Sequence, residues 1–167
     1  MQSLIPSEAR TASLERSTGE TSIKLSINLD GQGQYHVDTG NGFLDHMVGQ
    51  LARHGLFDIT LEAKGDVHVG WHHLVEDTAI MLGRAFREAL GEPRGIRRMG
   101  HAIVPLDETL VMVALDFSGR GYAVVETTLN EVMVETLSGD LIQHFLEAFA
   151  IEGRINLHAK VLAGVSP

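Results

Sequence analysis

The residues that decide the fold are His72-His73-Leu74-Val75-Glu76-Asp77, which lead directly into an amphipathic run that continues to Leu90. Apolar residues recur in this run with largely helical spacing, at Ile80, Leu82, Ala85, Phe86, Ala89 and Leu90. The pattern predicts a helix over residues 72–90 with a histidine pair and a carboxylate on its first turns.

The paired histidines of this helix can serve more than one partner. Adjacent helical residues point about 100° apart, so His72 and His73 cannot easily face the same ion. Glu76 follows His72 by four residues and His73 by three, which puts it within reach of either side chain. The spacing suits two metal ions, or one ion and another partner. The alternative is a pair of solvated histidines near a helix start.

The segments before this helix alternate between strand and helix patterns. Apolar residues occur at every second position in 21–29 and again in 57–63, which predicts two strands. Residues 34–38 read as a returning strand, and 43–54 as a helix ended by Gly55. Residues 1–9 are expected to form an irregular terminus.

The second part of the chain repeats this order. Glu20-Thr21 recurs as Glu108-Thr109, and at the same offset of 88 the alternating strand reappears as Val111, Val113, Leu115 and Phe117. The offset then grows to 98, where His46 matches His144 and Gly55 matches Gly153. An ordered series of matches favours an internal duplication. We therefore expect two halves, residues 1–92 and 93–167, that form one compact unit.

Composition narrows the function classes. The 167 residues are 44% hydrophobic, which is enough for a sizeable core, and carry a net charge of −9, which argues against nucleic-acid binding. There are no cysteines but nine histidines, so any metal must be held by His, Asp or Glu. Neither a membrane-spanning run nor the apolar core of a signal peptide is found, so a soluble, cytoplasmic protein is expected.

A series of stretches in both halves resembles the imidazoleglycerol-phosphate dehydratase family, whose members are lyases of histidine biosynthesis. In the first half they are Arg16–Thr21, Gly42–Met47, Gln50–Asp58 and His72–Thr78. In the second half they are Gly95–Gly100, Val104–Glu108, Asp116–Tyr122 and His144–Ala150. They follow the family order over nearly the whole chain, so the resemblance is specific.

The resemblance implies both a fold and a reaction. The implied fold is α+β, a tandem duplication of a ribosomal-protein-S5-domain-2-like half, with the helices sandwiched between two four-stranded sheets. The implied reaction dehydrates D-erythro-imidazole glycerol phosphate to imidazole acetol phosphate through a metal-stabilised deprotonated imidazole. The implied cofactor is Mn²⁺, two ions per active site. The implied partners are the small phosphate substrate and further copies of the chain, as a trimer or a 24-subunit shell with active sites between subunits.

The resemblance also assigns site residues. The expected metal ligands are His46, His72, His73, Glu76 and His144. Glu20 is expected to be the catalytic acid or base. The expected substrate-binding residues are Gln50, His54, Arg98 and Arg120, of which the two arginines grip the phosphate. The remaining histidines His36, His68, His101 and His158 are expected to be ordinary surface or core residues.

Two departures from the family pattern leave alternatives open. Gly70-Trp71 stands where the family has acidic or small polar residues. The family also has a second His-His-x-x-Glu motif and a lysine-bearing helix, which its spacing places after Pro167. We therefore expect the second half to stop before a final helix and the metal sites to be incomplete. The alternatives are a non-catalytic metal-binding or shell-forming protein, a truncated inactive form, and a metal-dependent hydrolase using the same ligands.

Overall fold

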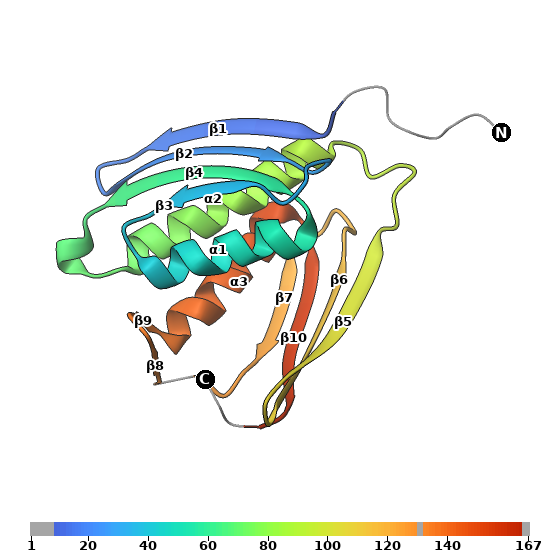
Figure 1. Ribbon diagram of the computed structural model, residues 1–167. Coiled ribbons are helices and arrows are strands. Elements are labelled where there is room, and N and C mark those ends of the chain that lie inside the picture. Colours follow the sequence, from blue (N-terminus) through green and yellow to red (C-terminus); the bar gives the residue numbers. More distant parts are fainter. Residues whose placement is uncertain (1–8, 130–131, 165–167) are drawn as a thin grey trace.

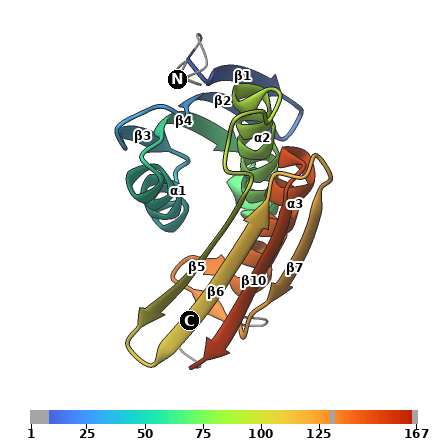
Figure 2. The same cartoon turned by 90° about the vertical axis from the view of Figure 1, so that its right-hand side faces the viewer.

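The computed structural model describes residues 9–129 and 132–164, so the expectation of an irregular terminus falls almost entirely outside the described residues. Within them, no helix is both long and apolar enough to cross a bilayer. Two sheets enclose a layer of helices (Figures 1 and 2), which confirms the predicted duplicated α+β fold.

The first half forms one sheet and two helices. Its elements are β1 (Thr11–Ser17), β2 (Thr21–Asn28), β3 (Tyr35–Asp38), α1 (Gly42–Gly55), β4 (Asp58–Gly65), the 3-10 turn η1 (Val67–Val69) and α2 (His72–Leu90). The sheet order is β1-β2-β4-β3, with β3 parallel to β4 and the other pairs antiparallel. Helix α1 begins at Asn41, whose side-chain oxygen accepts from the Leu44 amide at 3.0 Å, and this satisfies one of the free N–H groups of the first turn.

The second half repeats this topology. Its elements are β5 (Met99–Leu106), β6 (Thr109–Asp116), β7 (Tyr122–Glu126), the short β8 (Met133–Val134) and β9 (Leu137–Ser138), α3 (Gly139–Gly153) and β10 (Asn156–Ala163). The sheet order β5-β6-β10-β7 corresponds strand for strand to that of the first sheet. The linker 91–98 joins the halves, and the expected boundary at 92/93 falls inside it.

The growth of the repeat offset from 88 to 98 has a structural explanation. Strands β2 and β6 are related by 88 residues, whereas β4 and β10 are related by 98. The difference arises between β7 and α3, where the second half contains the β8–β9 hairpin and the first half has only residues 39–41. Thr136 of this hairpin accepts from the Asn41 side chain at 2.9 Å, so the extra segment contacts the start of α1.

Helix α2 is the centre of the molecule. It packs against β1 and β2 of the first sheet and against α3, and α3 packs in turn against β7 and β10 (Figure 1). Gly83 permits the approach of the two helices, because a Cβ there would lie 2.5 Å from the Phe149 carbonyl oxygen. The fully buried side chains around α2 include Ile23, Ile59, Leu61, Leu74 and Leu82.

The structure confirms the helix over 72–90 and shifts the first and last residues of several other predicted elements. The helix expected over 43–54 covers 42–55, and the strand expected over 57–63 covers 58–65. Strands β1 and β5 were not predicted. Both are edge strands: β1 has few apolar residues, and β5 contains Pro105, which is tolerated at a sheet edge because its missing N–H breaks no internal ladder.

Candidate active site

A cluster of two imidazoles and a carboxylate lies where α2 and α3 meet. Helix α2 begins at His72, two residues after Gly70, whose φ of 127° suits glycine and turns the chain toward the helix. Glu76 lies one turn further along, with Oε2 at 3.6 Å from His72 Nε2. Its other oxygen, Oε1, lies 3.2 Å from Nε2 of His144 on α3. The two imidazole rings are stacked, with centroids 5.0 Å apart.

This cluster fits a divalent metal ion. One ligand atom each from His72, Glu76 and His144 lies within 4.8 Å of the others. His144 Nε2 is buried and, within the described residues, forms no hydrogen bond, which is costly for a ring nitrogen unless another group binds it. Imidazole nitrogen with carboxylate oxygen is a donor set that suits Mn, Fe and Zn.

His73 points to a different partner set. Its ring makes an 85° angle with that of His72, and its Nδ1 lies 3.1 Å from Oδ2 of Asp66 and 3.9 Å from Oε2 of Glu20. The hydrogen bond with Asp66 is the main cause that raises the pKa of the His73 imidazole above its ordinary value. The two histidines therefore lie in different surroundings. His72 faces α3, whereas His73 faces the end of β4 and the turn between β1 and β2.

Glu20 is presented by the tight turn between β1 and β2. Its amide donates to Thr18 Oγ1 at 3.1 Å, and its carbonyl accepts from the Asp66 amide at 3.0 Å. The backbone is therefore held on both sides, while the carboxylate is exposed beside His73. A carboxylate in this position can exchange protons with a bound molecule.

Three further predicted residues lie on α1, away from this cluster. His46, Gln50 and His54 are spaced by four residues, which aligns them along one side of the helix. Both histidines are exposed and Gln50 is partly buried. Although His46 and His144 are equivalent in the repeat, the structure brings only His144 to Glu76.

The two predicted arginines lie at the opposite end of the helix pair. Arg98 pairs with Asp116 at 2.6 Å where β5 begins and β6 ends, and Arg120 is exposed in the turn between β6 and β7. The Asn156 side chain donates to the Arg120 carbonyl at 3.1 Å, which ties that turn to the start of β10. The nine residues from His144 to the end of α3 alone span roughly 13 Å, so the arginines do not reach the histidine cluster within one chain.

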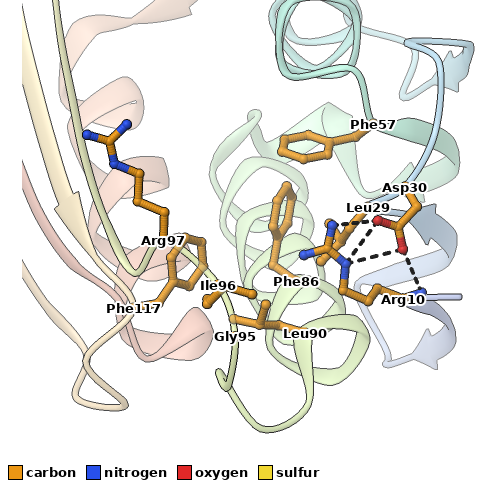
Figure 3. Close-up of a pocket in the computed structure, with 10 residues that line it drawn as sticks. All are labelled: Arg10, Leu29, Asp30, Phe57, Phe86, Leu90, Gly95, Ile96, Arg97 and Phe117. Atoms are coloured by element: carbon orange, nitrogen blue, oxygen red, sulfur yellow. Dashed lines mark hydrogen bonds and ion pairs between the residues drawn. The ribbon is translucent and has the colours of Figure 1, made fainter. Parts of the chain in front are cut away.

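A cavity of about 420 Å³ lies near the last turns of α2, and it is separate from the histidine cluster (Figure 3). Phe57 and Phe86 meet edge to face across its wall at 5.1 Å, and Arg10 is paired with Asp30 at its rim. Phe86 is fourteen residues beyond His72, or roughly 20 Å along the helix. No predicted metal ligand lines this cavity.

Two carboxylates near the cluster were not singled out from the sequence. Asp77 lies four residues after His73, a spacing that places both on one side of α2 and could have drawn attention to it. Asp66 lies directly after β4, and no local spacing connects it with His73. Its role follows from the way β4 ends beside the start of α2.

Comparison with known proteins places the chain in a family. Residues 39–167 match the family model described as imidazoleglycerol-phosphate dehydratase. The imidazoleglycerol-phosphate dehydratase of Dehalococcoides mccartyi strain 195 is 57% identical over 155 residues, which cover 93% of this chain and 78% of the relative. The protein of the same name from Roseiflexus sp. RS-1 is 55% identical over 96% of this chain and 80% of its own length.

Solved structures agree with the sequence relatives. The crystal structure of imidazoleglycerol-phosphate dehydratase from Staphylococcus aureus N315 superimposes with a TM-score of 0.81 at 31% identity, covering 92% of this chain and 85% of that chain. The enzyme of Pyrococcus furiosus, solved in complex with (S)-C348, gives 0.76 at 34% identity, with 90% and 80% covered. Sequence, fold and residue cluster agree: the chain belongs to the imidazoleglycerol-phosphate dehydratase family.

Proposed function

We propose that this chain dehydrates D-erythro-imidazole glycerol phosphate to imidazole acetol phosphate, with a metal centre on His72, Glu76 and His144. The observation that carries the proposal is the convergence of these three ligand atoms within 4.8 Å, in a chain whose family is that of the dehydratase. His73 and His46 are proposed as ligands of a second ion. The metal is proposed to be Mn²⁺, which the family resemblance implies and which the carboxylate of the donor set accepts.

The reaction requires a weakly acidic C–H bond to break. The substrate loses hydroxide from the carbon attached to the imidazole ring and a proton from the next carbon, and the resulting enol becomes the ketone. A divalent cation, when bound, supplies Lewis-acid stabilisation for negative charge on the imidazole ring. Glu20 is the proposed acid or base, because its carboxylate is exposed and lies next to the His73 ring.

The substrate phosphate needs cationic partners. Arg98 and Arg120 are proposed to bind it, since guanidinium groups form paired, charge-assisted hydrogen bonds with phosphate oxygens. Gln50 and His54 are proposed as further substrate contacts. Because nine residues of α3, roughly 13 Å, separate His144 from the end of the helix near the arginines, we propose that a neighbouring copy completes each site, in a trimer or 24-subunit homo-oligomer. An enzyme of amino-acid biosynthesis with this substrate is expected in the cytoplasm.

Metal removal tests the proposed function. The full chain is stripped with a chelator, its metal content is measured, and dehydration is assayed before and after Mn²⁺ is added back. We expect activity to disappear and to return with Mn²⁺. Activity in a verified metal-free sample would refute the metal-based proposal, and Mn²⁺ binding without turnover would favour a non-catalytic metal-binding protein.

Variants test the ligand assignment. Glu76→Gln should lower both Mn²⁺ content and kcat, since the amide carries no charge for the ion. His36→Ala is the control, because His36 is an exposed histidine on β3 outside the cluster. Equal metal content in the Glu76 variant and the wild type would remove Glu76 from the ligand set.

A further inference from the structure

Asp77 is a largely buried carboxylate that joins α2 to both strands flanking the Glu20 turn. Its side chain is only 11% exposed, although it directly follows Glu76. Oδ1 lies 3.0 Å from the Arg16 guanidinium on β1, and Oδ2 accepts a short hydrogen bond from the hydroxyl of Thr21, the first residue of β2. The two contacts therefore reach one residue on each side of the segment that carries Glu20.

A chain of hydroxyl groups leads from Asp77 to the Glu20 backbone, and its direction follows from the chemistry of the groups. An ionised carboxylate only accepts, so the single O–H of Thr21 must donate to Asp77. Thr21 Oγ1 then accepts from the Thr18 hydroxyl, 3.2 Å away, and the Thr21 carbonyl oxygen is a second acceptor for that hydroxyl at 3.4 Å. Thr18 Oγ1 in turn accepts from the Glu20 amide at 3.1 Å and from the Thr21 amide at 2.9 Å.

The hydrogens of both hydroxyls and both lone pairs of the Thr18 oxygen are thus assigned. Each hydroxyl donates once, and the Thr18 oxygen accepts from two amides, which uses both of its lone pairs. Hydrogen bonds in such chains polarise one another, and the carboxylate at the end makes the chain stronger. On the other side, the Glu20 carbonyl is fixed by the Asp66 amide.

We infer that Asp77, acting through Arg16 and the Thr21–Thr18 hydroxyls, is a positioning residue that holds the turn so that the Glu20 carboxylate stays beside His73. This inference rests on the proposed role of Glu20 as acid or base. His73 and Asp77 both belong to α2, so one helix positions the imidazole and, through Asp77, the carboxylate opposite it. Asp77 itself touches neither the Glu20 carboxylate nor a ligand atom of the histidine cluster.

Three variants separate this role from a general contribution to folding. Thr21→Val keeps the shape of the side chain but removes the hydroxyl, whereas Thr21→Ser keeps the hydroxyl. Asp77→Asn removes the charge at the end of the chain. Thr21→Val and Asp77→Asn should lower kcat by about 10- to 100-fold, because a small misplacement of a catalytic group can cost about 100-fold in rate, with KM and Mn²⁺ content unchanged. Thr21→Ser should restore kcat to near the wild-type value.

The control is Glu152→Gln. Like Asp77, Glu152 is a carboxylate that forms an ion pair with an arginine, and this pair also joins α2 to a neighbouring element. Glu152 accepts from Arg84 at 2.7 Å at the other end of the helix, so its loss should lower thermal stability without affecting kcat. Thr21→Val with wild-type kcat would overturn the inference. So would a loss of kcat that Thr21→Ser does not reverse, or one that follows the loss of bound metal.

A second measurement keeps the inference testable if the proposed function fails. Hydrogen-exchange mass spectrometry on overlapping peptides within residues 14–24 reports on a segment that includes the Glu20 and Thr21 amides, both of which donate to Thr18 Oγ1. We expect faster exchange there in Thr21→Val than in the wild type or Thr21→Ser. If the wild type does not dehydrate the substrate with Mn²⁺, the proposed function is refuted, but unchanged exchange in Thr21→Val would refute the positioning role independently.

Discussion

The two sheets of this molecule have the same strand order, yet matching residues are buried to very different extents. On β2, Ile23, Leu25 and Ile27 are between 0% and 3% exposed. Their counterparts on β6, at an offset of 88, are Val111, Val113 and Leu115, and all three are only half-buried. The pattern within a strand therefore determines which face is apolar, whereas the elements packed against that face determine how much of it is removed from water.

The helices account for the difference. Helix α2 crosses β1 and β2, whereas α3 packs on β7 and β10, at the other side of its sheet. In residues 9–129 and 132–164 no helix crosses β5 and β6. An apolar cavity of about 350 Å³ lies there instead, lined by α1, α3 and β6 and including Met47, Val113 and Phe145. The first sheet should therefore contribute more to stability than the second.

Truncating a buried residue of β2 should have the largest effect on the free energy of unfolding, and the matching residue of β6 provides the comparison. Ile27→Ala removes three carbons from a side chain that is 3% exposed, and should lower the free energy of unfolding by about 2–5 kcal/mol. Leu115→Ala removes the same number of carbons from the matching, half-buried position and should cost markedly less. Denaturant unfolding of both variants measures this. An equal loss at Leu115 would show that β6 is covered as completely as β2.

Disturbing the contact between α2 and α3 should have the next largest effect on the free energy of unfolding. A Cβ at Gly83 would lie 2.5 Å from the Phe149 carbonyl and 2.8 Å from the Gly153 amide, so Gly83→Ala must separate α2 from α3. We expect a loss of about 1–3 kcal/mol, as for other overpacked sites. Gly42→Ala is the control, because no atom lies within 4 Å of its Cβ position on the first turn of α1. Thermal unfolding compares the two, and similar melting temperatures would contradict the close packing.

The ion pair between the halves should have the smallest effect, and that effect should depend on pH. The hydrogen bond from Arg84 lowers the pKa of the Glu152 carboxyl below its ordinary value of 4.5. A carboxyl with a lowered pKa in the folded state stabilises the protein above its unfolded pKa, and this contribution disappears as the pH falls through the folded pKa.

Glu152→Gln should therefore be less stable than the wild type at pH 7, by about 0.2–1 kcal/mol because the pair is partly exposed. The difference should vanish in acid well below pH 4.5, the ordinary pKa of this carboxyl. Parallel unfolding curves at both pH values check the sign. A difference that grows in acid would show that the interaction with Arg84 does not stabilise the fold.

The sequence predicts α2 over its full length because apolar residues recur with largely helical spacing from Ile80 to Leu90, directly after the His72–Asp77 stretch. It does not predict β1 or β5, since an edge strand needs neither a strong alternation nor an unbroken set of N–H groups. At the site, the i to i+4 spacing of His72 and Glu76 is readable from the sequence. The sequence does not show that His144, rather than its repeat counterpart His46, lies next to Glu76. That placement depends on the packing of α3 against α2, whereas α1 packs on β3 and β4.

The histidine cluster has a consequence for the origin of the chain. His72 and Glu76 come from the first copy of the repeat and His144 from the second, so a single copy cannot bring these three side chains together. Two separate copies would have to associate before an ion could be held. Covalent fusion through residues 91–98 makes that encounter intramolecular, with an effective concentration in the millimolar range expected for a short linker. An ion bound there, as proposed above, would favour the joined state, so metal supply would also affect how firmly the two copies hold together.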